Sequence, residues 1–365
     1  MKAIGKDFGD VARKTYAVAS GALGNGNTCI VNSDGTVSVV SGSAAVLGTT
    51  VNFDTDEANG TDATFDSNSN RVVIVYRAFG SRAEFAAAQS LYPGITFDSN
   101  TNRVVIAFTD GGNSNYGAAV VGSVTAGDNS IAFGTEAVFE SANARYMKKG
   151  LCFDSNSNKV VISYMDIADG SAGKSVVATV TGSSTNSIAF GTAVEWTSQA
   201  VSDAYAAVFD TVNNKVVIGY RQADDSNKVK AIVGTVASTA ISFGTPAEGL
   251  GATGSGGFFS GVFDPDQGLS IFTFQSNTPT HNNSVFNTAT VTGTNVSFGT
   301  VTVSGESGEQ ASQFITYDTN SDRALLGYKN ATGTVGQCRV LEVPYTTLTS
   351  ENFIGITPSA YPTGA

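Results

Sequence analysis

The sequence predicts an all-β fold, a β-propeller of six four-stranded blades, with one blade trimmed and the ring closed by an N-terminal strand. Three observations predict it: the composition, a repeat with four strand-like segments per period, and a match between the two ends of the repeat region. Five or seven blades are the alternative counts.

The composition favours short strands joined by tight turns. The 365 residues include 41 glycines and only 7 prolines, and 14% of the residues are charged. Ser, Thr, Asn, Val and Ala make up much of the remainder, which suits strands and turns better than helices. A chain of this length can bury a large core.

The main signal is a repeat that opens with an aromatic–aspartate pair and ends ten residues after the aspartate with Tyr or Phe. A polar turn, a basic residue and an apolar run such as Val-Val-Ile lie between them in most copies. The anchoring aspartates are Asp66, Asp98, Asp154, Asp210, Asp264 and Asp318, so the steps between them are 32, 56, 56, 54 and 54 residues. The nearly continuous apolar run predicts a strand buried on both faces, as in the inner part of a blade.

Two further segments complete the period. An Ile-x-Phe-Gly-Thr segment or a close variant ends at Thr135, Thr192, Thr245 and Thr300, and an Ala-Val-Val-Gly-Ser-Val type of segment precedes it. Four strands in about 55 residues are typical of a propeller blade. The single step of 32 residues predicts one blade that lacks its third strand and the start of its fourth.

The two ends of the repeat region fit together. The last copy is followed by a third strand at 337–343 but by no Phe-Gly-Thr, whereas residues 46–53 match that missing segment in spacing. We therefore expect the N-terminal strand to complete the last blade and remove its exposed edge. The predicted domains are an N-terminal hairpin and attachment segment at 1–43, with Asp34-Gly35 as its turn, the propeller at 44–343, and a tail at 344–365.

Charge and cysteine usage exclude several classes of function. The net charge is −11 and no basic stripe is present, so nucleic acid is not expected as a partner. No apolar run long enough to cross a membrane is present, and the first residues do not resemble a signal peptide. Three widely spaced cysteines predict small core residues rather than a disulfide framework or a zinc site.

Candidate chemistry is sparse. The Asp-Ser-Asn-Ser-Asn turns resemble the first half of a calcium loop, but they join two strands and lack a following bidentate Glu, which favours a turn role. No cofactor is therefore expected, and calcium is the alternative. The one histidine, His281, lies in a polar loop without a nearby nucleophile. Catalysis is not predicted.

Loops that diverge on a shared scaffold are the expected place for recognition. The candidate binding residues are Tyr92, Asn113, Asn115, Tyr116, Tyr146, Tyr205, Phe258 and His281. Aromatic rings beside amide and carboxylate groups suit sugar recognition. The alternative is that these aromatic rings pack between blades.

The segments Phe-Asp-Ser-Asn-Ser-Asn-Arg-Val-Val-Ile at 65–74, Ala-Val-Val-Gly-Ser-Val at 119–124 and Ile-Ala-Phe-Gly-Thr at 131–135 resemble repeats of marine bacteriophage structural proteins, including tail-fibre and appendage proteins. Residues 348–356 and 360–365 also resemble a segment that recurs in such fibres. The resemblance covers about 46–365 and supplies no catalytic residues.

This resemblance implies a virion component that assembles in the host cytoplasm. The expected function is a tail-fibre protein whose propeller binds a host-surface receptor, with glycan as the first choice. Other virion proteins and a host-surface glycan or protein are the expected partners, and a homo-oligomer is an option. The alternatives are a structural decoration or connector protein and a carbohydrate-active enzyme.

Overall fold

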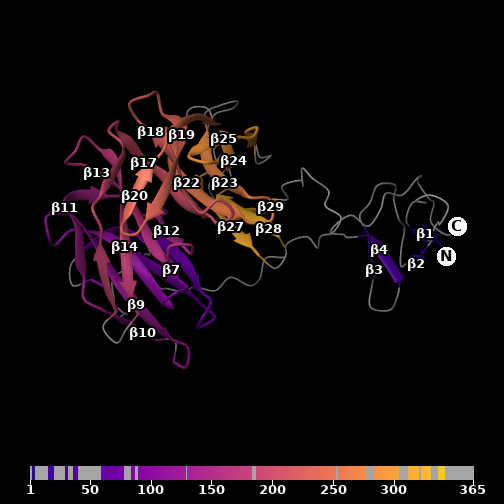
Figure 1. The fold of residues 1–365 in the computed structure, drawn as a ribbon, viewed down its shortest axis with the longest axis horizontal. Coiled ribbons are helices and arrows are strands. Elements are labelled where there is room, and N and C mark those ends of the chain that lie inside the picture. The colour runs from indigo at the N-terminus through magenta and orange to yellow at the C-terminus, as the bar shows by residue number, and fades with distance from the viewer. Residues whose placement is uncertain are drawn as a thin grey trace. The chain divides into compact units, whose positions relative to one another are not determined.

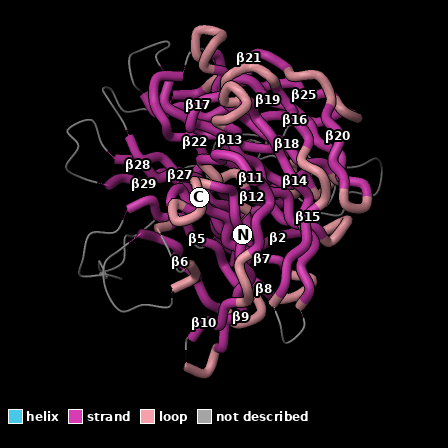
Figure 2. The backbone as a smooth tube through the Cα atoms, turned by 90° about the vertical axis from the view of Figure 1, so that its left-hand side faces the viewer, coloured by secondary structure: helices cyan, strands magenta, loops and turns pink. Residues whose placement is uncertain are grey.

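A computed structural model describes residues 59–341 except 78–83, 87–88, 129, 183–185, 252–253, 277–282, 304–310, 320–321 and 330–335, together with four short strands nearer the N-terminus. Strands and loops account for all of these described residues (Figure 2). The chain divides into two compact parts, Met1–Thr49 with Val343–Ala365, and Thr50–Glu342.

The first part contains a small sheet in the order β1-β2-β4-β3. Its strands are β1 (Lys2–Ile4), β2 (Thr15–Ala19), β3 (Cys29–Val31) and β4 (Thr36–Val39). Strands β3 and β4 pair antiparallel, with Ile30 opposite Ser38, which confirms the predicted hairpin. Its predicted Asp34-Gly35 turn lies outside the described residues.

The second part repeats one sheet pattern along the chain (Figure 1). In the fourth unit an inner strand β17 (Val201–Asp210) pairs with β18 (Lys215–Gln222), which pairs with β19 (Lys228–Ala237). Two short strands, β20 (Ala240–Phe243) and β21 (Ala247–Gly251), then pair with successive halves of β19. The predicted fourth strand is therefore two strands with a break between them.

Three units share this pattern with the fourth. The second consists of β7 (Ser90–Asp98), β8 (Arg103–Asp110), β9 (Tyr116–Thr125), β10 (Ser130–Phe133) and β11 (Ala137–Arg145). The third consists of β12 (Leu151–Asp154), β13 (Lys159–Asp166), β14 (Ala172–Thr181), β15 (Ser187–Phe190) and β16 (Val194–Thr197). The fifth consists of β22 (Gly254–Asp264), β23 (Leu269–Ser276), β24 (Asn283–Thr292), β25 (Asn295–Phe298) and β26 (Thr302–Val303).

The end units are shorter in the part that the structure describes. The first has β5 (Asn59–Asp66) and β6 (Arg71–Arg77), in line with the expected trimmed blade. The sixth has β27 (Ala311–Asp318), β28 (Arg323–Lys329) and β29 (Gly336–Leu341), so the predicted third strand near 337–343 is confirmed. The segment at 46–53, which was expected to complete this unit, lies outside the described residues.

The sheets stack face to face. Each inner strand contacts the inner strand of the next unit, in the order β5, β7, β12, β17, β22, β27. Successive residues of the second strand in a unit pack into the cores on opposite faces of its sheet. In β13, Val160 and Ile162 pack against the second unit, whereas Val161 packs against the fourth. Burial on both faces explains the continuous apolar runs. The fold is thus all-β and β-propeller-like, as predicted.

The second and third units share more than side-chain packing. The end of β11 pairs with the end of β13, with Ala144 opposite Asp166 and Arg145 opposite Met165. This pairing joins the strands of both units into one ten-stranded sheet.

The repeated aspartates cap the turns after the inner strands. Asp154 Oδ1 accepts the N–H groups of Asn156 at 2.9 Å and Ser157 at 3.0 Å, and Oδ2 accepts the Ser157 hydroxyl at 2.7 Å. The same backbone bonds recur at Asp66, Asp98, Asp210 and Asp264. The residue four positions after each aspartate, such as Asn158, has a positive φ, which suits Asn and Gly. The turn interpretation is confirmed.

The structure describes the side chains of two cysteines. Cys152 is buried, Cys338 is half-buried, and both are free thiols. Burial raises the pKa of the Cys152 thiol, and the nearby Asp154 charge adds to this shift. A search of the described residues finds no helix with the length and hydropathy needed to cross a membrane.

Candidate functional site

Six side chains from the first four units converge beside the inner strands. They are Asp62 of β5, Tyr92 of β7, Tyr146, Lys148 and Lys149 just before β12, and Tyr205 of β17. We call this set the axial cluster, because the inner strands of successive units meet there.

Asp62 links three units. Its side chain is 3% exposed, and Oδ1 lies 2.5 Å from Lys149 Nζ of the third unit. Oδ1 also accepts the N–H of Ala63, and Oδ2 accepts the N–H of Ile95 in the second unit at 3.2 Å. A buried carboxylate needs such partners, because an unpaired charge in the protein interior is costly.

Tyr92 and Tyr146 form an aromatic pair at the same place. Their ring centroids are 4.3 Å apart with an angle of 46° between the planes. Both side chains are half-buried, so part of the pair faces solvent. Tyr205 is buried, and its hydroxyl donates to the backbone carbonyl of Tyr146. Tyr205 therefore supports the pair from the fourth unit.

The backbone of the cluster adopts an uncommon conformation. Tyr92, Tyr146 and Lys149 have φ values of 51°, 61° and 63°. Non-glycine residues seldom occupy this region, and those that do concentrate at functional sites. Gly94 permits the close approach of the two segments, because a Cβ there would lie 2.3 Å from the Met147 carbonyl oxygen.

Lys148 is the other cation of the cluster. Its side chain is exposed, and it forms no ion pair or hydrogen bond with any other residue that the structure describes. Partial desolvation by surrounding protein lowers the pKa of its ammonium group, the Asp62 charge opposes this shift, and the Lys149 charge adds to it. The Lys148 side chain thus keeps access to solvent, while nearby protein atoms partly desolvate its ammonium group.

The structure therefore brings together three of the predicted binding residues, Tyr92, Tyr146 and Tyr205. The first two keep an exposed part, whereas Tyr205 packs between units, as the alternative interpretation held. The side chain of Phe258 and all of His281 lie outside the described residues.

Asn113, Asn115 and Tyr116 lie in or beside the β8–β9 loop. Asn113 donates its N–H to the Asp110 carbonyl and accepts the N–H of Tyr116 through its own carbonyl oxygen. The carbonyl oxygen of Asn115 accepts the N–H of Ala144 in β11. These backbone bonds shape the loop, and no described contact joins the three side chains to the axial cluster.

Sequence reasoning missed Asp62, Lys148 and Lys149 as site residues. Asp62 stands four positions before Asp66, where the other copies have Gly94, Gly150, Ala206, Ser260 and Phe314. A charged residue at a position that is otherwise small or apolar was the signal that could have identified it. Lys148 and Lys149 are adjacent in the sequence, and a pair of basic residues is too short to stand out as a basic stripe.

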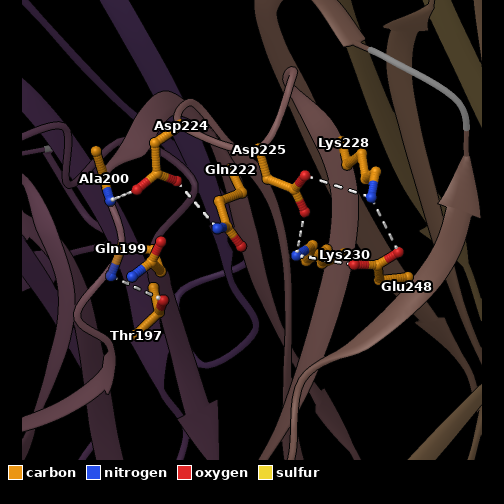
Figure 3. Close-up of polar contacts among 9 residues, drawn as sticks. All are labelled: Thr197, Gln199, Ala200, Gln222, Asp224, Asp225, Lys228, Lys230 and Glu248. Atoms are coloured by element: carbon orange, nitrogen blue, oxygen red, sulfur yellow. Dashed lines mark hydrogen bonds and ion pairs between the residues drawn. The ribbon is translucent and has the colours of Figure 1, made fainter.

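A second polar cluster lies around the β18–β19 loop (Figure 3). Lys230 binds Asp225 at 2.7 Å and Glu248 at 3.1 Å, and Lys228 contacts the same two carboxylates. Hydrogen bonds from Lys230 and Lys228 lower the pKa of both Asp225 and Glu248. Asp224 accepts from Gln222 and from the N–H of Ala200. The two lysines neutralise Asp225 and Glu248, and hydrogen bonds satisfy Asp224, so this cluster fits a structural role.

One carboxyl pair lies in the second unit. Burial raises the pKa of Glu136, and the Asp110 charge and a hydrogen bond to Asp110 raise it further. Glycosidases place their two carboxyl groups about 5–9 Å apart, on either side of the glycosidic bond, with room for a water in the inverting enzymes. Two carboxyl groups in direct hydrogen bond do not match that spacing. The described residues contain no group of three or more acidic, His or Cys side chains suited to a metal ion.

Comparison with known proteins gives structural neighbours only. No protein-family model and no curated protein matches the chain. An exo-β-1,3-galactanase from Phanerochaete chrysosporium, solved with β-1,3-galactotriose, is similar with a TM-score of 0.41 and 11% identity over 81% of this chain and 65% of that one. This chain thus spans less than two thirds of the galactanase.

Two further structures are similar at the same level. RS223-Beta-xylosidase has a TM-score of 0.35 and 7% identity over 74% of this chain and 96% of that one. A putative 6-phosphogluconolactonase from Bacteroides uniformis has a TM-score of 0.34 and 8% identity over 77% of this chain and 91% of that one.

These comparisons contradict the expected function of a tail-fibre protein that binds a host-surface receptor, because glycosidases appear where virion proteins were expected. That prediction is wrong for a physical reason. The motifs behind the resemblance are the aspartate-capped turns and the strands buried on both faces, which encode the scaffold and no activity. The expected absence of catalysis finds no support in these comparisons either.

Proposed function

We propose that this chain is a carbohydrate-active enzyme that binds its saccharide at the axial cluster. The observation that carries the proposal is the convergence of four units, where one turn carries both Tyr146 of the half-buried tyrosine pair and Lys149 of the Asp62–Lys149 ion pair. Ligand sites combine aromatic surface with a few fixed polar groups in this way.

The residues have distinct roles in this proposal. The Tyr92–Tyr146 pair offers aromatic surface to the apolar face of a sugar ring. Asp62 is held in place by Lys149 and by two backbone N–H groups, so it is a fixed negative charge. Because its side chain is only 3% exposed, Asp62 acts through its charge, which can stabilise the positive charge that develops during glycoside cleavage.

Glycoside cleavage also needs an acid that protonates the leaving group. Asp62 does not suit that role, because its hydrogen-bonding partners in the structure are all donors. The acid is thus another residue, and a screen of acidic positions would identify it once cleavage is measured.

The test is an oligosaccharide cleavage assay. The panel contains β-1,3-galacto-oligosaccharides, xylo-oligosaccharides and uronate oligosaccharides, and chromatography measures the products. The Asp62→Asn and Tyr146→Ala variants are compared with Asp128→Asn, a change in an exposed turn. We expect cleavage that both cluster variants lose and the control retains. Cleavage of nothing in the panel, or equal cleavage by all variants, would overturn the proposal.

We also propose that the six units close into a ring, with residues 46–53 completing the last sheet. The two end sheets support this, because each has an apolar face that packs on no described neighbour. The first unit exposes Phe65, Val72 and Ile74, and the sixth exposes Phe314 and Val340, by 38–64%. The second strands of the second to fifth units are buried on both faces, and closure would bury the two end sheets in the same way.

The Val72→Asp variant tests closure. In a closed ring Val72 is buried, so the substitution should cost about 3 kcal/mol or more, as buried unpaired charges do. Val212→Asp is the control, because Val212 is 58% exposed in an aspartate-capped turn of an interior unit. Equal unfolding midpoints for the two variants would show that the ring is open.

The expected virion localisation, the virion and host-surface partners and the homo-oligomer stay predictions, because neither the fold nor the comparisons bear on them.

A further inference from the structure

The charges of the axial cluster point to one class of saccharide. The axial cluster contains two ammonium groups, Lys148 and Lys149, and one carboxylate, Asp62. The charges of Asp62 and Lys149 both act on Lys148. The cluster thus carries one net positive charge in a protein whose net charge is −11.

The two lysines are not equivalent. Lys149 is half-buried, and its ammonium lies 2.5 Å from Asp62 Oδ1, so its charge is neutralised within the protein. Lys148 is exposed and has no ion-pair partner among the described residues. Its charge is therefore the one that a ligand can neutralise.

The surroundings strengthen such a contact. Lys148 stands in the short segment that carries Tyr146 and Lys149. Hydrogen bonds to the backbone carbonyls of Tyr146, Met147 and Lys149 hold this segment in place. Partial desolvation, which lowers the pKa of its ammonium group, also reduces the screening of any charge that pairs with it. An anionic group bound there would restore favourable solvation of the ammonium.

We propose that the axial cluster binds an anionic saccharide, with Lys148 as the residue that recognises the negative group and the Tyr92–Tyr146 pair as the surface that holds the sugar ring. This inference rests on the proposed function and adds the substrate class to it. A single ammonium group recognises a uronic carboxylate and a sulfate ester by the same charge, so the experiment must separate these two sources.

The experiment measures binding by calorimetry for three probes of equal length: a uronate oligosaccharide, the same oligosaccharide with its carboxyl groups reduced to alcohols, and a sulfated neutral oligosaccharide. We expect the wild type to bind at least one anionic probe about fivefold or more tightly than the reduced probe, as one partly desolvated ion pair would give. The anionic probe that binds better identifies the source of the charge.

Two lysine variants complete the test. Lys148→Gln should remove the preference for the anionic probe, measured as the ratio of the affinities for the anionic and the reduced probe. Lys215→Gln changes the net charge equally at the start of β18, opposite Asp210, and it should change neither affinity.

The outcomes separate the two proposals. If the reduced probe binds as tightly as both anionic probes, or if Lys148→Gln keeps the preference, the anionic class is wrong while saccharide binding stands. If no probe binds at all, both the anionic class and the proposed function fail.

Discussion

The aspartate-capped turns allow a quantitative prediction of stability for variants of Asp154 in the third unit. Its carboxylate is buried and accepts three hydrogen bonds within four residues of chain. Replacement by Ala removes all three, and each contributes about 1 kcal/mol net, so Asp154→Ala should lower the free energy of unfolding by about 3 kcal/mol.

Asp154→Asn should cost less. The amide oxygen can still accept the two backbone N–H groups, and the amide nitrogen can donate to the Ser157 hydroxyl, so the expected loss is about 1 kcal/mol. The matched control is Asp128→Ala, which removes an exposed aspartate that caps Ser130 in the β9–β10 turn, and its effect should be much smaller.

The assay is urea unfolding followed by the fluorescence of Trp196, the single tryptophan, which is buried in the core between the third and fourth units. Variants with the same slope are compared by their midpoints, because a shift at constant slope reports a change in stability. The urea midpoint should fall in the order wild type, Asp154→Asn, Asp154→Ala. If Asp154→Ala loses no more stability than Asp128→Ala, the turn bonds do not stabilise the fold as argued.

Two further predictions concern the second unit. Gly94→Ala should lower the free energy of unfolding by about 2 kcal/mol or more, because the new Cβ would lie 2.3 Å from the Met147 carbonyl oxygen. The control Gly127→Ala should be neutral, because nothing lies within 4 Å of its Cβ. Equal unfolding midpoints for the two variants would contradict this reasoning. Glu136→Gln should stabilise the protein at pH 7, because the raised pKa of Glu136 means that its ionised form is disfavoured in the folded state. The gain should vanish below the ordinary pKa near 4.5, where Glu136 is protonated in both states, and a gain that persists at pH 3 would count against this cause.

The turns and inner strands could be predicted because their chemistry is local and repeated. The bonds of Asp154 reach only two or three residues along the chain, and the apolar run at 160–162 is buried on both faces as its composition implies. Six copies of such a pattern predict the strand and turn positions.

The split fourth strand could not be predicted in the same way. Its break depends on Gly191 and its equivalents, whose N–H groups bond to the third strand. A Cβ at Gly191 would also collide with the Thr239 carbonyl of the next unit. The sequence shows a glycine there, but the neighbour that requires it is about one repeat away.

The candidate site was only partly predictable for a related reason. Tyr92 and Tyr146 stood out as aromatic residues in divergent loops, whereas Asp62 and Lys149 are 87 residues apart and meet only when three units are stacked. No spacing rule within one repeat connects them.

The pairing of β11 with β13 has a consequence for folding. In an array whose repeats touch only through side chains, each repeat can open by itself, and cooperativity depends on the interfaces. Here backbone hydrogen bonds cross from the second repeat to the third. Backbone bonds from Ala207 to Lys149 and from Val201 to Ser171 tie the fourth repeat to the same block. Amide exchange should therefore find the second to fourth repeats opening together, with the end repeats opening at lower free energies. The block also holds Tyr92, Tyr146, Lys148 and Lys149, so most of the ligand-facing groups lie on the segment expected to fray last.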